Sequence, residues 1–132
     1  MSSSVLVIGA SGYIGLGVAI GFRRAGYRVY GLIRNGKHST TLLQHEIEPI
    51  VAQAFDDIQS CADLLASCSI IIDAVGYTPG LSTCLLEASV RAGKARTDNG
   101  RLSHYAPLHI FTSGIMTCKS CASFSSPDDC FD

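Results

Sequence analysis

Apolar residues occur along this chain in short stretches, and Val5–Ile8 is an uninterrupted apolar run with the length of a buried β-strand. Parallel strands that are covered on both faces are apolar at nearly every position rather than at alternate ones. The run Ile70-Ile71-Ile72 is the clearest example. The pattern predicts strands over Val5–Ile8, Arg28–Ile33, Pro49–Ala52, Ser69–Val75 and Leu108–Thr112.

Segments with helical periodicity lie between the predicted strands. Ile14, Val18 and Phe22 recur every four residues, and we expect them to line the buried face of one helix. Gly26 is well placed as the cap just beyond the end of that helix. The predicted helices are Tyr13–Ala25, Lys37–His45, Asp57–Ala66 and Pro79–Ala92, the last of which ends at Gly93.

Strands that alternate with helices indicate βαβ units with right-handed crossovers. The predicted fold class is α/β: one domain with a doubly wound parallel sheet of about five strands in the order 3-2-1-4-5. Residues 1–113 form this domain, and Lys94–Pro107 is expected to be a polar surface loop within it. Residues 114–132 are rich in serine, have no clear period and are expected to form an irregular C-terminal tail.

A glycine-rich stretch links the first predicted strand to the first predicted helix. Gly9 lets the chain turn sharply, Gly12 lets the backbone approach a phosphate, and Gly15 lets the helix pack closely on the sheet. The helix N-terminus offers unpaired N–H groups and about half a positive charge to an anion. The stretch predicts a bound dinucleotide, and a tight turn that binds nothing is the alternative. The residues expected at the cofactor are Gly9, Ser11, Gly12, Tyr13, Ile14 and Gly15.

The residues at the end of the second strand are expected to contact the ribose of the adenosine and to distinguish NAD from NADP. An Asp or Glu there selects NAD by accepting hydrogen bonds from the 2′-hydroxyl, but this strand is followed by Arg34 and Asn35. An arginine holds a 2′-phosphate through charge-assisted hydrogen bonds of roughly 1.5–3 kcal/mol each. Both residues are therefore predicted to bind the cofactor, with NADP preferred to NAD. A solvated loop arginine is the alternative.

Two further strand ends carry candidate contacts. Asp56, after the third strand, is expected either to meet the adenine amino group or to cap the following helix. Asp73-Ala74-Val75-Gly76 closes the fourth strand, where small residues let the backbone approach the ribose and pyrophosphate. The alternative there is a plain strand-ending glycine. The predicted contacts are Asp56, Ala74, Val75 and Gly76.

Composition narrows the class of partner. The 132 residues carry a formal net charge of −1 and no run of Lys or Arg, which argues against a nucleic-acid or membrane-surface partner. No apolar stretch reaches the ~18 residues of a membrane span, and the first residues lack the pattern of a signal peptide. We therefore expect a cytoplasmic protein without a membrane partner.

The cysteines suggest no metal site. Cys118 and Cys121 form one C-x-x-C, with Cys130, His104 and His109 as further candidate ligands. A structural zinc site usually has two such pairs, and a redox C-x-x-C normally opens a helix in a thioredoxin-like context. An incidental tail motif without metal is the expectation.

Four stretches together resemble the extended and atypical short-chain dehydrogenase/reductases. They are Gly9–Gly15, Arg34, Asp73–Gly76 and Ile110–Gly114. This superfamily includes the NAD-dependent epimerase/dehydratases and their NmrA-like relatives. The resemblance runs from about Val5 to Gly114 and implies a Rossmann fold, NAD(P) binding and often sugar-nucleotide or carbonyl chemistry.

The chain lacks the residues that carry catalysis in this family. The family's catalytic pair is a Tyr with a Lys four residues later, and none of the five tyrosines here has a Lys at that distance. The family's catalytic Ser or Thr lies just after the fifth strand, near Thr112, Ser113 and Gly114. Only eighteen residues follow Gly114, too few for the family's substrate-binding lobe. The catalytic residues are therefore unknown.

Three interpretations remain open at this stage. The first is an oxidoreductase domain whose catalytic half is missing from this chain. The second is an NADP sensor or partner-binding module without chemistry, as in some NmrA-like relatives. The third is a truncated product without a function of its own. Losing the strands after the fifth would expose one sheet edge. A dimer is one way to cover that edge, but the sequence specifies no oligomeric state.

Overall fold

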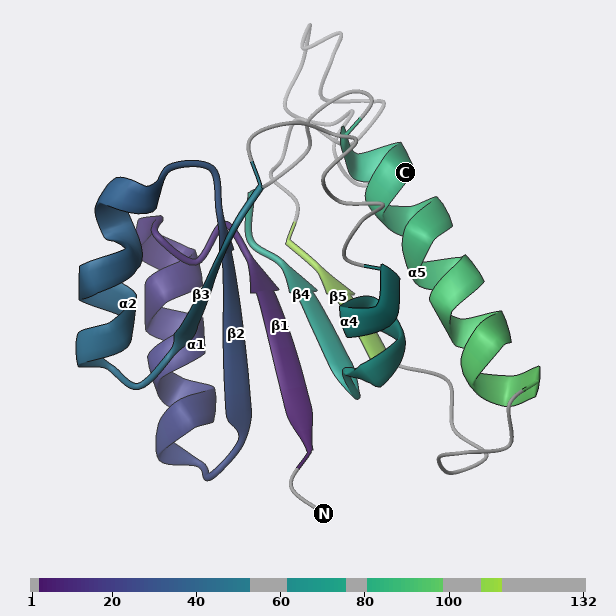
Figure 1. Ribbon diagram of the computed structural model, residues 1–132, viewed down its shortest axis with the longest axis horizontal. Helices are drawn as coiled ribbons and strands as arrows, with labels where there is room; N and C mark the ends of the chain where they lie inside the picture. The colour runs from purple at the N-terminus through teal and green to yellow at the C-terminus, as the bar shows by residue number, and fades with distance from the viewer. Residues whose placement is uncertain (1–2, 53–61, 76–80, 99–107, 113–132) are drawn as a thin grey trace, which may run out of the picture.

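The computed structural model describes residues 3–52, 62–75, 81–98 and 108–112. In these residues helices and strands alternate along the chain, as Figure 1 shows. The strands are β1 (Ser4–Ile8), β2 (Arg28–Ile33), β3 (Glu48–Val51), β4 (Ile70–Asp73) and β5 (Leu108–Phe111). The helices are α1 (Tyr13–Arg24), α2 (Ser39–Gln44), α4 (Ala62–Ser67) and α5 (Leu81–Asp98), with a short 3-10 helix, η1 (Gly36–His38).

The strands form one parallel sheet in the order β3-β2-β1-β4-β5. The helices α1 and α2 cover one face of the sheet, and α4 and α5 cover the other (Figure 1). The chain runs outward from the central strand β1 to β3, returns to β4 beside β1, and then reaches β5. This confirms the predicted α/β class, the doubly wound Rossmann-like topology and the strand order.

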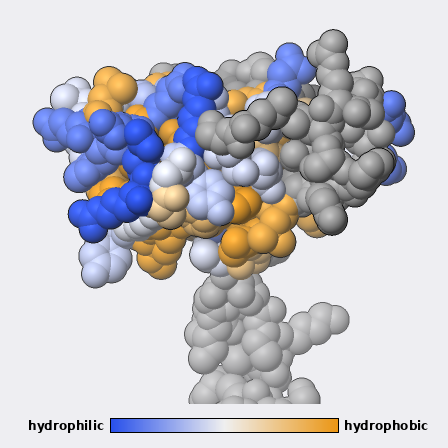
Figure 2. Space-filling model, turned by 90° about the horizontal axis from the view of Figure 1, so that it is seen from below, coloured by the Kyte–Doolittle hydropathy of each residue, from blue (hydrophilic) through white to orange (hydrophobic). Residues whose placement is uncertain are grey.

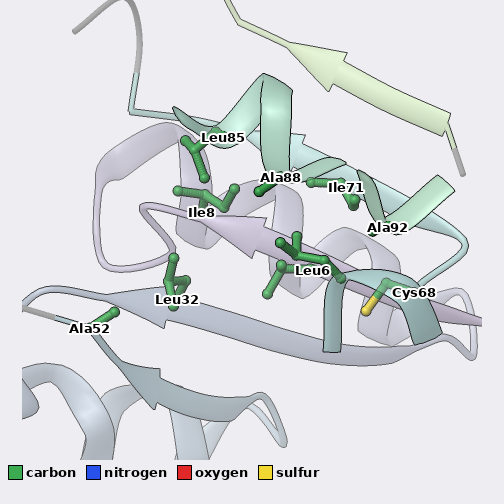
Figure 3. Close-up of a cluster of buried hydrophobic side chains, with 10 residues drawn as sticks. Leu6, Ile8, Leu32, Ala52, Cys68, Ile71, Leu85, Ala88 and Ala92 are labelled. Atoms are coloured by element: carbon green, nitrogen blue, oxygen red, sulfur yellow. The ribbon is translucent and has the colours of Figure 1, made fainter. Parts of the chain in front are cut away.

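Two hydrophobic clusters hold the helices to the sheet. Val5 and Val7 of β1 point toward α1 and α2, whereas Leu6 and Ile8 point toward α4 and α5. All four side chains are at most 3% exposed, because both faces of β1 are covered. Burying each such side chain contributes roughly 1.5–3 kcal/mol. Figure 3 shows the cluster on the second face: Leu6, Ile8, Leu32, Ala52, Cys68, Ile71, Leu85, Ala88 and Ala92.

The end of α1 confirms the predicted glycine cap. Gly26 has φ +95, and its N–H donates to the carbonyl oxygen of Arg23 at 3.1 Å. The N–H of Tyr27 donates to the carbonyl oxygen of Phe22, also at 3.1 Å. These two hydrogen bonds form a Schellman motif. The rings of Phe22 and Tyr27 meet edge to face with their centroids 5.3 Å apart, which supplies the hydrophobic contact that usually accompanies this motif.

The buried face of α1 differs from the prediction at its first turn. Ile14 is 57% exposed, and the fully buried residues of the helix are Gly15 and Ala19. Val18 and Phe22 are half-buried and pack against the core at the sides of this line, as predicted. The helix starts beyond the end of β1, so the side chain of Ile14 stands at the edge of the sheet rather than over its face.

Two predicted helix boundaries were wrong. The helix α5 continues through Gly93 to Asp98, so Lys94–Asp98 is helix rather than the predicted loop. A glycine inside a helix costs only about 1 kcal/mol, which packing of the same helix on the sheet outweighs. The segment predicted as a helix over Lys37–His45 is divided into η1 and α2. Of the helix predicted over Asp57–Ala66, residues 57–61 lie outside the described residues, as does the tail 114–132.

The far edge of the sheet is apolar. In the described part of the chain β5 pairs only with β4, and Leu108, Ile110 and Phe111 are 57%, 40% and 43% exposed. Figure 2 shows hydrophobic residues gathered at the surface of the face seen from below, beside hydrophilic ones. Among the described residues, none of the helices is long and apolar enough to cross a membrane.

Replacing Gly26 with Ala should destabilise the protein. A side chain at φ +95 is strained, and the expected loss is about 1 kcal/mol of unfolding free energy. Urea unfolding followed by circular dichroism measures it. The matched control is Gly21→Ala inside α1, where a Cβ meets nothing within 4 Å. That variant should gain up to about 1 kcal/mol from helix propensity, and equal effects of the two changes would contradict the assignment.

Candidate functional site

The carboxyl ends of β1, β2 and β4 meet at one edge of the sheet, at the top of Figure 1. The strand order reverses here, since β2 follows β1 along the chain on one side and β4 lies against β1 on the other. Open α/β sheets bind ligands in the crevice outside such a switch point. Three segments of the chain leave the sheet at this edge: the turn 9–12, residues 34–35 and residues 74–75.

The turn after β1 is built around Gly9. Its φ is +80, a conformation that L side chains rarely adopt. The N–H groups of Gly9 and Ala10 both donate to the carbonyl oxygen of Leu32 in β2, at 2.9 and 3.3 Å. A Cβ at Gly9 would also lie 2.8 Å from Cγ2 of Val75. Glycine is therefore required at this position by both the backbone and the neighbouring segment.

Gly15 brings α1 against the turn. A Cβ on this residue would overlap the carbonyl oxygen of Gly9 and lie 2.8 Å from the Gly9 carbonyl carbon. No side chain fits in this space, because the obstacle is backbone that cannot move aside. The absent side chain fixes where the first turn of α1 sits. The role predicted for Gly15, close packing of the helix, is thus present in the fold.

Gly12 is different from the other two glycines. It is exposed, its φ of −75 and ψ of 168 suit any residue, and a Cβ there would meet only the carbonyl oxygen of Gly9, at 3.4 Å. Nothing in the described protein therefore requires a glycine at this position. Gly12 lies at the N-terminus of α1, where an approaching phosphate would come close to the backbone.

The first turn of α1 presents free hydrogen-bond donors. In the described residues the N–H groups of Tyr13, Ile14 and Gly15 have no acceptor, and Gly12 supplies no side-chain cap. No acidic residue lies in this first turn, while two arginines lie in the last turn, which matches the charge preference of a helix dipole. The side chain of Tyr13 is 99% exposed beside these donors. The arrangement suits an anion.

The end of β2 provides a cation and no carboxylate. Arg34 is exposed, and the ion pairs of the described residues, Arg23–Glu46 and Arg28–Glu48, do not involve it. The side-chain oxygen of Asn35 accepts a hydrogen bond from the N–H of Lys37 at 3.0 Å and so caps η1. Arg34 is therefore available to a ligand at this edge, whereas the amide oxygen of Asn35 already has a local partner.

The end of β4 is tied to both of its neighbours. The N–H of Ala74 donates to the carbonyl oxygen of Ile8 at 2.9 Å. The side chain of Asp73 is 1% exposed, and its Oδ1 accepts from the N–H of Val75 at 3.1 Å. Burial raises the pKa of Asp73, while the hydrogen bond from Val75 and the nearby His109 oppose the shift. This buried carboxylate holds the turn that follows the strand.

The end of β5 joins the same group of contacts. The N–H and the hydroxyl of Thr112 both donate to the carbonyl oxygen of Asp73, at 3.0 and 2.6 Å. The hydroxyl proton of Thr112 is thus already hydrogen-bonded to the backbone of β4. Ser113 and Gly114 lie outside the described residues. Both ring nitrogens of His109 are buried without a hydrogen-bond partner among the described residues.

Most of the predicted site residues meet at this edge. Their contact with a ligand remains a prediction, and Asp56 and Gly76 lie outside the described residues. The described residues contain no group of His, Cys, Asp and Glu side chains that would hold a metal ion. Sequence reasoning missed the hydrogen bonds of Asp73, although an Asp side chain often accepts a hydrogen bond from the backbone N–H two residues on, as it does here from Val75. The predicted residues at the edge are Gly9, Ser11, Gly12, Tyr13, Ile14, Gly15, Arg34, Asn35, Ala74 and Val75.

No protein-family model matches the chain, and no curated protein sequence matches it. Solved structures share its fold. An isoflavone reductase superposes with a TM-score of 0.58 at 19% identity, over 70% of this chain and 34% of the other. A short-chain dehydrogenase from Streptomyces avermitilis gives 0.51 at 22% identity, over 74% and 43%. A reductase from a structure-guided engineering study of asymmetric catalysis gives 0.61 at 17% identity, over 97% and 42%.

The chain therefore spans 34% to 43% of the length of these three proteins. At identities of 17% to 22% the likeness concerns the fold alone. It confirms the Rossmann-type topology.

His109 should make stability depend on pH. Burial lowers its pKa, and the Asp73 carboxylate partly opposes this shift. A histidine with a lowered folded-state pKa binds its proton more readily when unfolded, so stability falls as pH drops through about 6.5. The variant His109→Leu should lose less unfolding free energy than the parent between about pH 7.5 and 5.5 in urea titrations. The control His45→Gln replaces an exposed histidine, and a parental slope in His109→Leu would contradict the assignment.

Proposed function

We propose that this chain, a domain with the Rossmann-type fold, binds a nicotinamide dinucleotide across the carboxyl edge of β1, β2 and β4. One observation carries the proposal: the surroundings of Gly9, Gly12 and Gly15 differ in whether they leave room for a side chain. The fold requires Gly9 and Gly15, whereas no described residue requires a glycine at Gly12, which lies beside N–H groups of α1 that have no acceptor among the described residues. A pyrophosphate bound against Gly12 would explain the absence of a side chain there.

We further propose that NADP is preferred to NAD. The support is the exposed cation Arg34 at the end of β2, where a carboxylate would select the 2′-hydroxyl of NAD. The planar guanidinium can form two parallel hydrogen bonds to a 2′-phosphate. Asn35 would contribute through its amide nitrogen, because its oxygen caps η1.

Cofactor binding is the activity we assign to the 132 residues themselves. Bound NADPH would supply a hydride, but a reductase of this type also needs a proton donor, and no tyrosine here has a lysine four positions later. Thr112 does not fill that role, since its hydroxyl donates to the backbone of Asp73. Carbonyl or epimerase chemistry would thus require groups from outside these residues.

A second candidate is an NADP sensor of the NmrA-like kind, located in the cytoplasm. Its support is the same missing Tyr/Lys pair together with the exposed apolar side chains of β5, which a partner would cover. A sensor should bind NADP and NADPH with affinities that differ by about tenfold or more, because only a difference in affinity lets binding report the ratio of the two forms. A catalytic domain should bind both forms and turn over a carbonyl substrate once the proton donor is provided.

Replacing Gly12 with Val should abolish cofactor binding without unfolding the protein. The side chain would occupy the space left for the pyrophosphate, so the affinity for NADPH should fall at least about tenfold. Calorimetry and the fluorescence of NADPH measure it, and the chain has no Trp to interfere.

The matched control is Gly17→Ala on the exposed side of α1, where a Cβ meets nothing within 4 Å. It should bind NADPH as the parent does. Unchanged binding by Gly12→Val would overturn the proposed site.

Replacing Arg34 with Gln should weaken NADP and spare NAD. Loss of a charge-assisted contact predicts roughly a tenfold to hundredfold drop in NADP affinity and less than about a threefold change for NAD. Arg24→Gln makes the same change of charge at the opposite end of α1 and should alter neither affinity. If NADP and NAD bind equally to the parent, the preference for NADP is wrong.

A further inference from the structure

A buried carboxylate lies under the edge of the sheet without being one of the expected ligand contacts. Asp73 ends β4 and is 1% exposed, on the face of the sheet that α4 and α5 cover. Ionised groups in such surroundings are costly unless they are hydrogen-bonded. An apolar residue would pack here without that cost. The hydrogen bonds that Asp73 makes to its neighbours explain why a carboxylate stands at this position.

The hydrogen bonds of Asp73 fix two neighbouring segments. Its Oδ1 accepts from the N–H of Val75, which sets the direction of the chain just after the strand. Its backbone oxygen accepts twice from Thr112, so the ends of β4 and β5 are held together. Its side chain and main chain together determine where the backbone after β4 runs.

That backbone lies directly against the glycine-rich turn. A Cβ built on Gly9 would be 2.8 Å from Cγ2 of Val75 and 3.4 Å from its nitrogen. The N–H of Ala74 also donates to Ile8, the last residue of β1. No room for a side chain is left between Gly9 and Val75, so the two turns lie close together, and a shift of Val75 would move it relative to Gly9.

Among the described residues, Asp73 has one charged or titratable neighbour, His109. From β5, His109 lies on the same face of the sheet, paired in register with Ile71. From α5, the residues buried against this face are uncharged. The hydrogen bond from the N–H of Val75 is therefore the contact that explains a hydrogen-bond acceptor at position 73.

We propose that Asp73 is a positioning residue for the dinucleotide: through Val75 it holds the chain after β4 against Gly9, beside the path of the pyrophosphate and the nicotinamide ribose. This inference rests on the proposed cofactor function. The adenosine end of the ligand, which Arg34 would hold beyond β2, is independent of this contact. A change at Asp73 should therefore affect the two halves of the cofactor unequally.

Two variants separate the hydrogen bond from the charge. Asp73→Asn keeps an oxygen that can accept from Val75, whereas Asp73→Leu has the same branching and the same number of side-chain heavy atoms but no acceptor and no charge. Ser89→Ala is the control, because it removes a buried hydroxyl that lacks a hydrogen-bond partner on α5, away from the turn. Each protein is titrated with NADPH and with adenosine 2′,5′-bisphosphate, which carries the adenosine half only.

Asp73→Leu should bind NADPH about tenfold more weakly and the bisphosphate within about threefold of the parent, while Asp73→Asn and Ser89→Ala keep both affinities. Equal losses for both ligands in Asp73→Leu would show a merely structural role and overturn the inference. Parental NADPH affinity in Asp73→Leu, or an equal loss in Asp73→Asn, would also overturn it. A parent protein that binds neither ligand would instead refute the proposed function.

Discussion

The close approach of α1 to the turn after β1 is the contact on which the remaining structure depends. Because Gly15 has no side chain, the first turn of the helix rests on the carbonyl group of Gly9. This places the helix over one face of the sheet, where Ala19 and its neighbours can bury apolar surface against Val5 and Val7. It also leaves the first N–H groups of α1 at the sheet edge, where the candidate site is formed.

A second set of contacts completes the edge from the other side. The turn after β4 packs on Gly9 through Val75, and Asp73 holds that turn and the end of β5. The sheet thus presents two turns at its switch point, each fixed by backbone hydrogen bonds to the neighbouring strand. A site of this kind is preorganised, because the turns that would contact a ligand are hydrogen-bonded to strands of the sheet.

The sequence predicted the elements and their order well, because burial on both faces leaves a strong apolar signal in each strand. Gly26, Gly9 and Gly15 were interpreted correctly, since each meets a backbone need of the fold, whereas the role of Gly12 stays a prediction. The errors lie where packing overrides the local signal. A glycine at 93 did not end α5, which packs on the sheet through Leu85, Ala88 and Ala92 and continues to Asp98. Ile14 fits the helical period, yet the start of the helix lies beyond the strand.

The sequence by itself determined the strand–turn–helix unit, the parallel sheet and the cation after β2, because these depend on short-range patterns of apolar, glycine and charged residues. Only the tertiary structure decided which glycine is free for a ligand and which the fold requires. It also decided that Asp73 is buried beneath the site and that the hydroxyl of Thr112 donates to the backbone of Asp73. These facts depend on contacts between residues far apart in the chain: Val75 meets Gly9, and Thr112 meets Asp73, only after β4 and β5 have paired beside β1.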